Sequence, residues 1–361
     1  MKAQGPISVL LVLDLPLLSR LLATELNRHE SIRVVGMARD TLRARDLILQ
    51  HHPEVIVLDV SRNEGMSLLH KLRMCYPVPV VACIAPMANS GPRAVRAAAL
   101  GALEVLVRPQ SPLGPALSSF AQELARHIEA ASQARPSPIR GIATAWDAPP
   151  FAGQGLIPSQ YVVAVGASTG GTEAIRAFLA NAPADFPATV IVQHMPAGFT
   201  ASFAERLDQF SPMLVREAAA GEALAPGRAL LARGDVHLVV RRARGGWRVH
   251  YGHKELVNRH CPSVDVLFES VAAAAGPRSV GVLLTGMGDD GARGLLRMHE
   301  CGALTLAQAA ETCVVYGMPK VAVQLGAVDY TAAPDEMPRL IQQALAARVA
   351  KGAEGCPTAQ Q

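Results

Sequence analysis

Short hydrophobic runs alternate with longer stretches of helical periodicity along residues 7–130. The runs are Ile7–Leu13, Ile32–Met37, Val55–Leu58, Val78–Cys83 and Leu103–Val107. A buried strand followed by a helix, repeated in this way, predicts a parallel sheet with right-handed crossover connections. We therefore expect an α/β domain of the flavodoxin-like type, with a five-stranded parallel sheet.

A change of composition separates this region from a second one. Residues 131–159 are rich in Pro, Ala, Ser and Gly and have no sustained hydrophobic period, which is typical of a linker. Hydrophobic runs return in residues 160–349, for which we expect a doubly wound α/β domain, and residues 350–361 are predicted to be a flexible tail. The buried strands expected there are Tyr161–Val165, Thr189–Gln193, Ser279–Thr285 and Ala303–Leu306.

Residues 228–251 follow a different pattern, in which the hydrophobic runs are shorter and alternate with polar positions. The runs are Leu230-Leu231, Val236–Val240 and Trp247–His250. Such spacing is more typical of antiparallel hairpins than of buried parallel strands. A small antiparallel hairpin region is therefore expected inside the second domain.

Composition narrows the class of protein. A length of 361 residues with 50% apolar residues suits two domains with their own cores. A net charge of +4 is too weak to indicate nucleic-acid binding, and no apolar run reaches the roughly 18 residues that cross a bilayer. Asp14 and Pro16 interrupt the first apolar run, which argues against a signal peptide. None of the six cysteines forms a C-x-x-C pair, so we expect a cytoplasmic protein without a zinc site or disulfide framework.

The segment Gly166-Ala167-Ser168-Thr169-Gly170 fits the pattern G-x-S-x-G between a predicted strand and a predicted helix. In this pattern small neighbours allow a tight turn that exposes the serine hydroxyl, and the helix N-terminus favours a nearby oxyanion. A glycine-rich turn without chemistry is an equally open interpretation of this segment taken alone.

Two other polar residues also follow predicted strands. His194 comes directly after Thr189–Gln193, and Asp290 comes shortly after Ser279–Thr285. Because open α/β sheets bind ligands at the carboxyl ends of their strands, a serine, a base and an orienting carboxylate would meet there. His194 as an ordinary loop histidine and Asp290 as a helix cap remain alternatives, but the joint placement favours a catalytic triad.

A nicotinamide dinucleotide site is the competing interpretation of the glycine turn. Tyr316 and Lys320 have the Y-x-x-x-K spacing of short-chain dehydrogenases. That pair must share one face of a helix, which Gly317 and Pro319 would disrupt. The strand after the glycine turn also ends without a carboxylate for a ribose hydroxyl. The dehydrogenase hypothesis is therefore the weaker one.

Several separate motifs give the sequence a family likeness. They are Gly166–Gly171, Gln193–Pro196, Val257–His260, Pro262–Phe268 and Leu284–Gly291. Together they make the chain resemble the bacterial chemotaxis protein-glutamate methylesterases over nearly its whole length. The resemblance implies hydrolysis of glutamate methyl esters on the cytoplasmic helices of chemoreceptors, with release of methanol, and deamidation of receptor glutamines. It implies no cofactor for catalysis and no metal in the catalytic domain.

The same resemblance assigns roles to individual residues. Ser168 is the implied nucleophile, His194 the general base and acid, and Asp290 the orienting carboxylate. The backbone N–H of Met287 is implied in an oxyanion hole, and the other implied site-lining residues are Thr169 and His260. The sequence departs from the family pattern at three positions near these motifs: Asp289 replaces an asparagine, Cys261 an arginine and Arg233 a proline.

The first domain is similar to a response-regulator receiver, a regulatory domain that a chemotaxis histidine kinase phosphorylates. Asp59 matches the phospho-accepting position and Asp14 the acidic site, where Mg²⁺ binds if the domain is phosphorylated. Leu13 replaces the second acidic residue, Ile84 the hydroxyl residue that senses phosphate, and Arg108 the usual lysine. The loop after Asp59 is shortened. We predict a degenerate receiver that is phosphorylated poorly or not at all, in which Asp59 is simply a solvated carboxylate or a weak acceptor.

The two halves leave a second class of function open. If the chemistry of both domains were vestigial, the chain would be a non-catalytic signalling adapter. The intact triad motifs beside an eroded phosphate site favour an active enzyme with altered control.

Overall fold

The computed structural model describes residues 5–75, 78–87, 90–111, 114–134, 150–151 and 156–354. The chain divides into two compact units, residues 1–138 and 139–361. Most of the predicted linker, residues 131–159, and the last residues of the predicted tail, 355–361, lie outside the described residues.

The first unit has a five-stranded sheet in the order β2-β1-β3-β4-β5, with every neighbouring pair parallel. This order is that of flavodoxin-like domains, so the predicted fold class of this unit is confirmed. The strands are β1 (Ile7–Val12), β2 (Ile32–Ala38), β3 (Val55–Asp59), β4 (Val80–Ile84) and β5 (Glu104–Val107).

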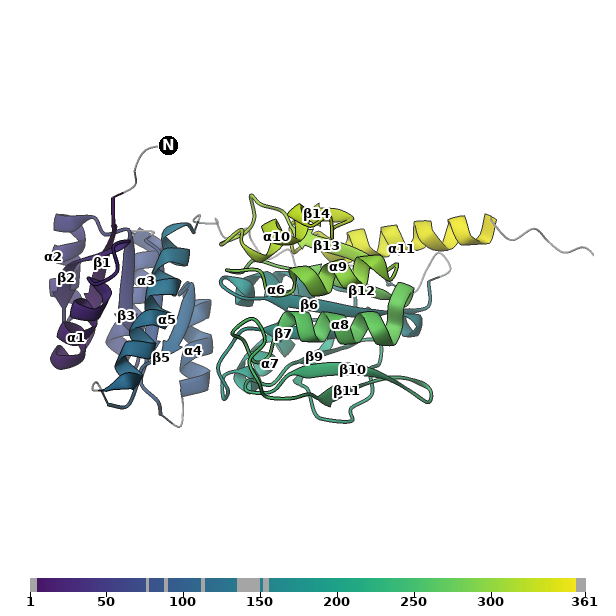
Figure 1. Ribbon diagram of the computed structural model, residues 1–361, viewed down its shortest axis with the longest axis horizontal. Coiled ribbons are helices and arrows are strands. Elements are labelled where there is room, and N and C mark those ends of the chain that lie inside the picture. The colour runs from purple at the N-terminus through teal and green to yellow at the C-terminus, as the bar shows by residue number, and fades with distance from the viewer. Residues whose placement is uncertain are drawn as a thin grey trace, which may run out of the picture. The chain divides into compact units, whose positions relative to one another are not determined.

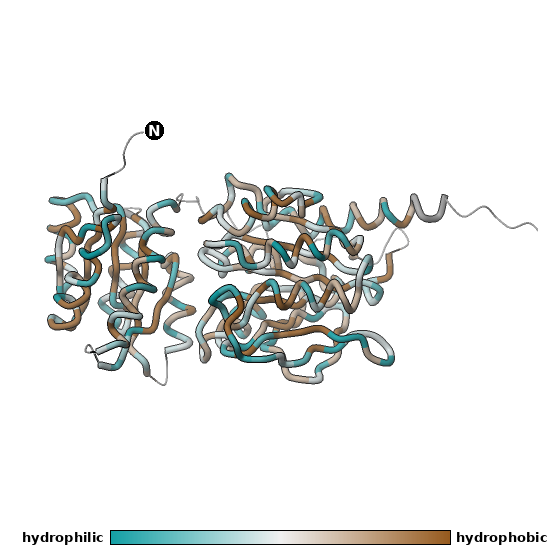
Figure 2. Tube along the Cα trace, in the orientation of Figure 1, coloured by the Kyte–Doolittle hydropathy of each residue, from teal (hydrophilic) through white to brown (hydrophobic). Residues whose placement is uncertain are grey.

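A helix follows each of these strands. The helices are α1 (Pro16–Leu26), α2 (Thr41–His51), α3 (Asn63–Cys75), α4 (Ser90–Ala99) and α5 (Pro115–Ser132). Both α1 and α5 begin with a proline, whose fixed φ suits the first turn and whose missing N–H costs no helical hydrogen bond there. The apolar faces of α1 and α5 join β1 in one core, which includes Leu11, Leu22 and Phe120. The central strands of this unit are accordingly hydrophobic in Figure 2.

The second unit has a seven-stranded sheet in the order β14-β13-β12-β6-β7-β9-β8, again with parallel pairs throughout. Its strands are β6 (Val162–Ala167), β7 (Ala188–Gln193), β8 (Leu214–Glu217), β9 (Arg228–Leu231), β12 (Ser279–Leu283), β13 (Leu304–Gln308) and β14 (Tyr330–Ala332). The chain adds β7, β9 and β8 on one side of β6 and then returns to add β12 on the other side. The order therefore reverses between β6 and β12, which confirms the doubly wound prediction.

The predicted hairpin region is only partly antiparallel. β10 (Leu238–Ala243) and β11 (Gly246–Tyr251) form a two-stranded antiparallel sheet. The prediction was wrong for Leu230 and Leu231, because β9 joins the parallel sheet between β7 and β8. A run this short carries no signal for its partner, and the burial of Leu230 and Leu231 on opposite faces of β9 is what places it inside the sheet.

Helices α8 and α9 pack together and contact β6 and β12, as Figure 1 shows. Gly166 lets α8 approach β6 closely, because a Cβ there would lie 2.2 Å from Val264 Cγ1. The helices of this unit are α6 (Gly171–Ala180), α7 (Thr200–Asp208), α8 (Val264–Ala275), α9 (Ala292–Glu300), α10 (Met318–Gln324) and α11 (Met337–Glu354), with short 3₁₀ turns η2 (Pro158–Gln160) and η3 (Gly276–Arg278). α11 thus continues beyond residue 349, the predicted end of the domain. Among the described residues, every helix is too short or too polar to span a lipid bilayer.

Candidate active site

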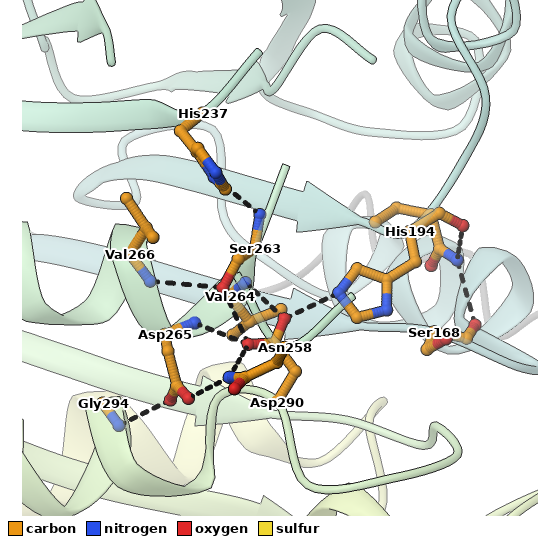
Figure 3. Close-up of polar contacts among 11 residues, drawn as sticks. Ser168, His194, His237, Asn258, Ser263, Val264, Asp265, Val266, Asp290 and Gly294 are labelled. Carbon is orange, nitrogen blue, oxygen red and sulfur yellow. Dashed lines mark hydrogen bonds and ion pairs between the residues drawn. The ribbon is translucent and has the colours of Figure 1, made fainter. Parts of the chain in front are cut away.

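The three residues of the predicted triad lie at the carboxyl edge of the second sheet. Ser168 directly follows β6, His194 directly follows β7, and Asp290 lies in the loop between β12 and α9. These strands flank the point where the strand order reverses, which is where doubly wound sheets bind ligands. In Figure 3 the imidazole of His194 stands between Ser168 and Asp290.

The backbone around Ser168 is fixed by hydrogen bonds. The Ser168 N–H donates to the carbonyl of Thr285 at 3.0 Å, and the Ser168 carbonyl accepts from the Gly171 N–H at 2.7 Å and from Gln193 Nε2 at 2.9 Å. Gly170 turns the chain into α6 with a φ of 76°, a left-handed conformation that favours glycine. The turn therefore holds Ser168 in place between the strand and the helix.

His194 makes its main polar contact with Asp290. Nε2 of His194 lies 2.8 Å from Oδ2 of Asp290, and the side chains are 7% and 2% exposed. Because an ionised carboxylate can only accept, Nε2 carries the proton and Nδ1 is the acceptor. Nδ1 is buried, has no hydrogen-bond partner among the described residues, and lies on the side of the ring that faces Ser168 (Figure 3).

The hydroxyl of Ser168 and the ring of His194 share no hydrogen bond within the described part of the chain. Hydrogen bonds between a nucleophile and its base are often long in ligand-free enzymes and tighten when substrate binds. The backbone is nevertheless in place for this contact, because the His194 N–H donates to the carbonyl of Ala167 at 3.1 Å. β7 thus sets His194 beside the residue that precedes Ser168.

Asp290 is surrounded by hydrogen-bond donors from the start of α8 and the turn that precedes it. Besides His194, they are Asn258 Nδ2 at 2.8 Å, Ser263 Oγ at 2.7 Å, and the backbone N–H groups of Val264 at 2.7 Å and Asp265 at 3.3 Å. Burial acts to raise the pKa of Asp290, but the hydrogen bonds from His194, Asn258 and Ser263 outweigh it and hold this pKa well below its usual range. The carboxylate therefore stays ionised opposite His194.

A second buried carboxylate, Asp265, lies beside Asp290. It accepts from Asn258 Nδ2 at 2.6 Å and from the Gly294 N–H, at the start of α9, at 2.7 Å. Burial raises the pKa of Asp265 to about 6, and the charge of Asp290 adds to this effect. Asn258 therefore bridges two carboxylates, as Figure 3 shows.

Sequence reasoning assigned no role to Asn258, Ser263 or Asp265. A weak signal was present, because Ser263 and Asp265 are typical of the first turn of a helix, where Ser263 caps α8. Their contact with Asp290 depends on the packing of α8 against the loop after β12. Behind them, the Ser263 N–H donates to Nδ1 of the buried His237 at 3.0 Å, while Nε2 of His237 contacts the carbonyl of Glu255 at 2.8 Å.

The three other predicted site residues also lie close by. The ring of His260 stacks on that of His194, with centroids 3.7 Å apart and planes inclined by 10°. Thr169 is buried, and its carbonyl accepts from Thr285 Oγ1 at 3.0 Å. Met287 follows Gly286, where a Cβ would lie 2.8 Å from that of Ser168. The Met287 N–H has no hydrogen-bond partner among the described residues and can therefore donate to a bound oxyanion.

The features that suggested a dehydrogenase do not form such a site. Tyr316 pairs with Gly286 in an isolated bridge, and α10 begins only at Met318. Tyr316 and Lys320 therefore do not share one face of a helix, as the dehydrogenase arrangement requires.

The carboxylates of the first unit have a different environment. Asp59, the last residue of β3, accepts from the Ser61 N–H at 2.8 Å, and Arg108 Nε lies 3.4 Å from its Oδ2. Asp14 forms an ion pair with Arg62 at 3.5 Å. Burial, helped by the charge of Asp14, raises the pKa of Asp59, although Ser61 and Arg108 act to lower it.

This donor set does not fit a magnesium site. Mg²⁺ takes oxygen ligands at close to octahedral geometry, and here a guanidinium stands opposite each of the two carboxylates. The described residues contain no group of three or more His, Cys, Asp or Glu side chains that could hold a metal ion. Ile84, at the position of the usual hydroxyl residue, is fully buried.

Comparison with known proteins shows the family to which the chain belongs. The family model described as CheB methylesterase matches residues 163–341. Two relatives carry the name protein-glutamate methylesterase/protein-glutamine glutaminase: one from Photorhabdus laumondii, 45% identical over 90% of this chain and 92% of its own, and one from Pseudomonas aeruginosa, numbered 2, 44% identical over 90% and 93%. The crystal structure of the Thermotoga maritima CheB methylesterase catalytic domain is 36% identical and has a TM-score of 0.50, over 51% of this chain and 97% of that one. The chain therefore belongs to the protein-glutamate methylesterase/protein-glutamine glutaminase family.

Proposed function

We propose that this protein is a serine hydrolase that demethylates glutamate methyl esters on chemoreceptors and deamidates receptor glutamines in chemotaxis adaptation. The observation that carries the proposal is the buried His194–Asp290 hydrogen bond beside Ser168, at the carboxyl edge of the sheet. The relatives are named for both activities, which differ only in the group that leaves.

Acylation begins with Ser168. Its Oγ attacks the ester carbonyl carbon while Nδ1 of His194 takes the hydroxyl proton, and Asp290 stabilises the imidazolium that forms. The N–H groups of Met287 and Thr169 donate to the oxyanion of the tetrahedral intermediate. When the intermediate collapses, the C–O bond to the methoxy group breaks and His194 protonates the departing methanol. A glutamyl ester of Ser168 remains.

Deacylation repeats the same steps with water. His194 Nδ1 takes a proton from water, which attacks the acyl carbon, and the proton then passes to Ser168 Oγ as the glutamate carboxylate leaves. With a glutamine substrate, ammonia leaves in the first step. Each step uses only side-chain and backbone groups, so we propose that catalysis needs no metal or cofactor.

The proposed substrates set the partners and the place of action. The esters lie on long, exposed receptor helices in the cytoplasm, and a site at the edge of a sheet suits such a surface better than a deep pocket does. For the first unit we propose that a chemotaxis histidine kinase docks on it without phosphorylating it efficiently. Phosphorylation is inefficient because Arg108 faces Asp59 and the carboxylates do not fit Mg²⁺.

Methanol release from receptor membranes carrying labelled methyl esters tests the proposal. We expect Ser168→Ala to reduce release to the uncatalysed level, whereas the matched variant Ser159→Ala, at an exposed serine of η2, retains wild-type release. Near-normal turnover by Ser168→Ala would eliminate the scheme. Binding of receptor by a wild-type protein that releases no methanol would favour the adapter hypothesis instead.

A further inference from the structure

A tight turn with an unusual backbone lies against the site. Val257 and His260 exchange two backbone hydrogen bonds, of 3.0 and 2.9 Å, around the two residues between them. Those residues, Asn258 and Arg259, have φ values of 51° and 68°. Two left-handed residues in succession are typical of a type I′ turn, in which asparagine is common but arginine is strained. The fold therefore maintains this turn at some cost in conformational energy.

The side chain of Asn258 uses both of its N–H donors. One hydrogen bond goes to Asp290 Oδ1 at 2.8 Å and the other to Asp265 Oδ2 at 2.6 Å. An asparagine amide has no further hydrogen to donate, so these two contacts fix its orientation. The backbone of the turn requires only a residue that tolerates a positive φ, and glycine would serve it. The two contacts to carboxylates are thus beyond what the turn itself needs.

These contacts matter because of where the carboxylates lie. Asp290 uses Oδ2 for His194 and Oδ1 for Asn258, so the amide helps to fix the rotation of the carboxylate that orients the imidazole. Asp265 lies close enough for its pKa to respond to the charge of Asp290. The amide, whose two hydrogens are positive, separates two acidic groups that otherwise repel each other. The last residue of the same turn, His260, stacks its ring on that of His194.

We propose that Asn258 is a positioning residue for the hydrolytic reaction, acting through Asp290 rather than on the substrate. It holds the carboxylate so that Oδ2 stays aimed at Nε2 of His194, and it shields that carboxylate from Asp265. The test by kcat rests on the proposed function, because it needs ester hydrolysis. The placement of Ser168, His194 and Asp290 can also be tested by a measurement that does not depend on that function.

The first test compares two glycine variants. Asn258→Gly keeps the left-handed backbone and removes the amide, whereas Arg259→Gly relieves the same strain one residue later without touching Asp290. We expect kcat for ester hydrolysis to fall about 10- to 100-fold in Asn258→Gly, with KM unchanged, and to stay within about twofold of wild type in Arg259→Gly. Equal kcat values for the two variants would overturn the proposal.

A second variant separates positioning from a merely structural role. Asn258→Asp has the same shape and also tolerates a positive φ, but it puts a third carboxyl group between Asp265 and Asp290. When protonated, this group can still donate one hydrogen bond to Asp290. We therefore expect the ratio of variant to wild-type kcat to rise as the pH falls from 8 to 6. A ratio that stays flat across this range contradicts the proposal, even if Asn258→Gly fails to fold.

Labelling of Ser168 with an alkyl fluorophosphonate, followed by mass spectrometry, needs no receptor. We expect Asn258→Gly to be labelled at least about 10-fold more slowly than wild type and Arg259→Gly. The comparison is made between proteins whose melting temperatures are similar, so that a difference in stability does not explain the rates. If the wild type is labelled but releases no methanol, the proposed function fails while this comparison still decides the role of Asn258. Equal labelling rates in folded wild type and Asn258→Gly refute that role.

Discussion

Asp290 and Asp59 occupy comparable places in two different sheets. Asp59 is the last residue of β3 and Asp290 lies in the loop after β12, so both are at the carboxyl edge of a doubly wound parallel sheet, and each is at most 8% exposed. Asp290 accepts five hydrogen bonds, from His194, Asn258, Ser263 and two backbone N–H groups at the start of α8. Asp59 accepts one backbone hydrogen bond and has Arg108 at 3.4 Å, while its Oδ2 makes no hydrogen bond within the described residues.

The difference appears in the direction of the two pKa shifts. Burial acts to raise both values, but at Asp290 the donors outweigh it and the pKa falls, whereas at Asp59 burial prevails and the pKa rises. A buried carboxylate is held ionised by hydrogen bonds aimed at both oxygens, and one nearby guanidinium without hydrogen-bond geometry is a poor substitute. Two buried carboxylates at the carboxyl edge of the same kind of sheet can therefore differ in whether their surroundings favour the ionised form.

The largest expected effect comes from neutralising Asp290. We expect Asp290→Asn to lower kcat for methyl ester hydrolysis about 10⁴-fold, because a neutral amide cannot fix the proton of His194 on Nε2 or stabilise the imidazolium. Steady-state methanol release measures the effect. The matched control is Asp289→Asn at the preceding, exposed aspartate, which we expect to stay within about threefold of wild type. A comparable loss in both variants would mean that the loop, rather than the Asp290 charge, matters.

The three triad residues that the sequence predicted at this site come after the ends of strands. Ser168, His194 and Asp290 follow recognisable hydrophobic runs, and the common edge of a parallel sheet brings such residues together. Asn258 and Ser263 reach Asp290 from a turn and a helix start, whose placement depends on how α8 packs against the rest of the unit. No period or spacing in the sequence encodes that packing, so their role could not be predicted.

The fold shows the same limit. Long runs such as Ile7–Leu13 and Thr189–Gln193 correspond to β1 and β7 within a residue or so. The short edge strands β8 and β14 were not predicted, and β9 was placed in a hairpin although it is parallel. Few residues of an edge strand are buried, so their hydrophobic signal is weak, and only the sheet itself decides their partners.

The next-largest expected effect is on the pH dependence of stability and concerns Asp265. Like Asp59, and unlike Asp290, this buried carboxylate has a raised pKa. The folded protein holds the proton of Asp265 up to about pH 6, whereas the unfolded chain releases it near pH 4. Its ionisation therefore lowers the free energy of unfolding as the pH rises from 4 to 6, by roughly 2 kcal/mol. We expect Asp265→Asn to remove this dependence, so that the stability of the variant relative to wild type improves by that amount between pH 4 and 7.

Urea unfolding followed by tryptophan fluorescence measures this change, since the buried Trp247 lies in β11 of the second unit. Any hydrogen bond that the amide fails to make costs the same at every pH and does not alter the slope. Glu205→Gln, at an exposed glutamate of α7 that does not contribute to the pKa shift of Asp265, is the matched control and should leave the slope as in wild type. Parallel pH profiles for wild type and Asp265→Asn would show that Asp265 is ionised in the folded protein throughout this range.

The smallest expected effect concerns Asp59 itself. With acetyl phosphate and Mg²⁺ we expect only trace phosphorylation of the wild type, because Arg108 stands opposite the carboxylate and the site lacks a second acidic residue at Leu13. Arg108→Lys replaces the rigid guanidinium by a mobile ammonium and should raise the phosphorylated fraction a few-fold, whereas Arg126→Lys, at an exposed arginine of α5, should not. Intact-mass spectrometry measures the fraction. Stable, stoichiometric modification of wild-type Asp59 would show that one carboxylate partner is enough to bind the metal, and that the contrast with Asp290 concerns hydrogen bonding alone.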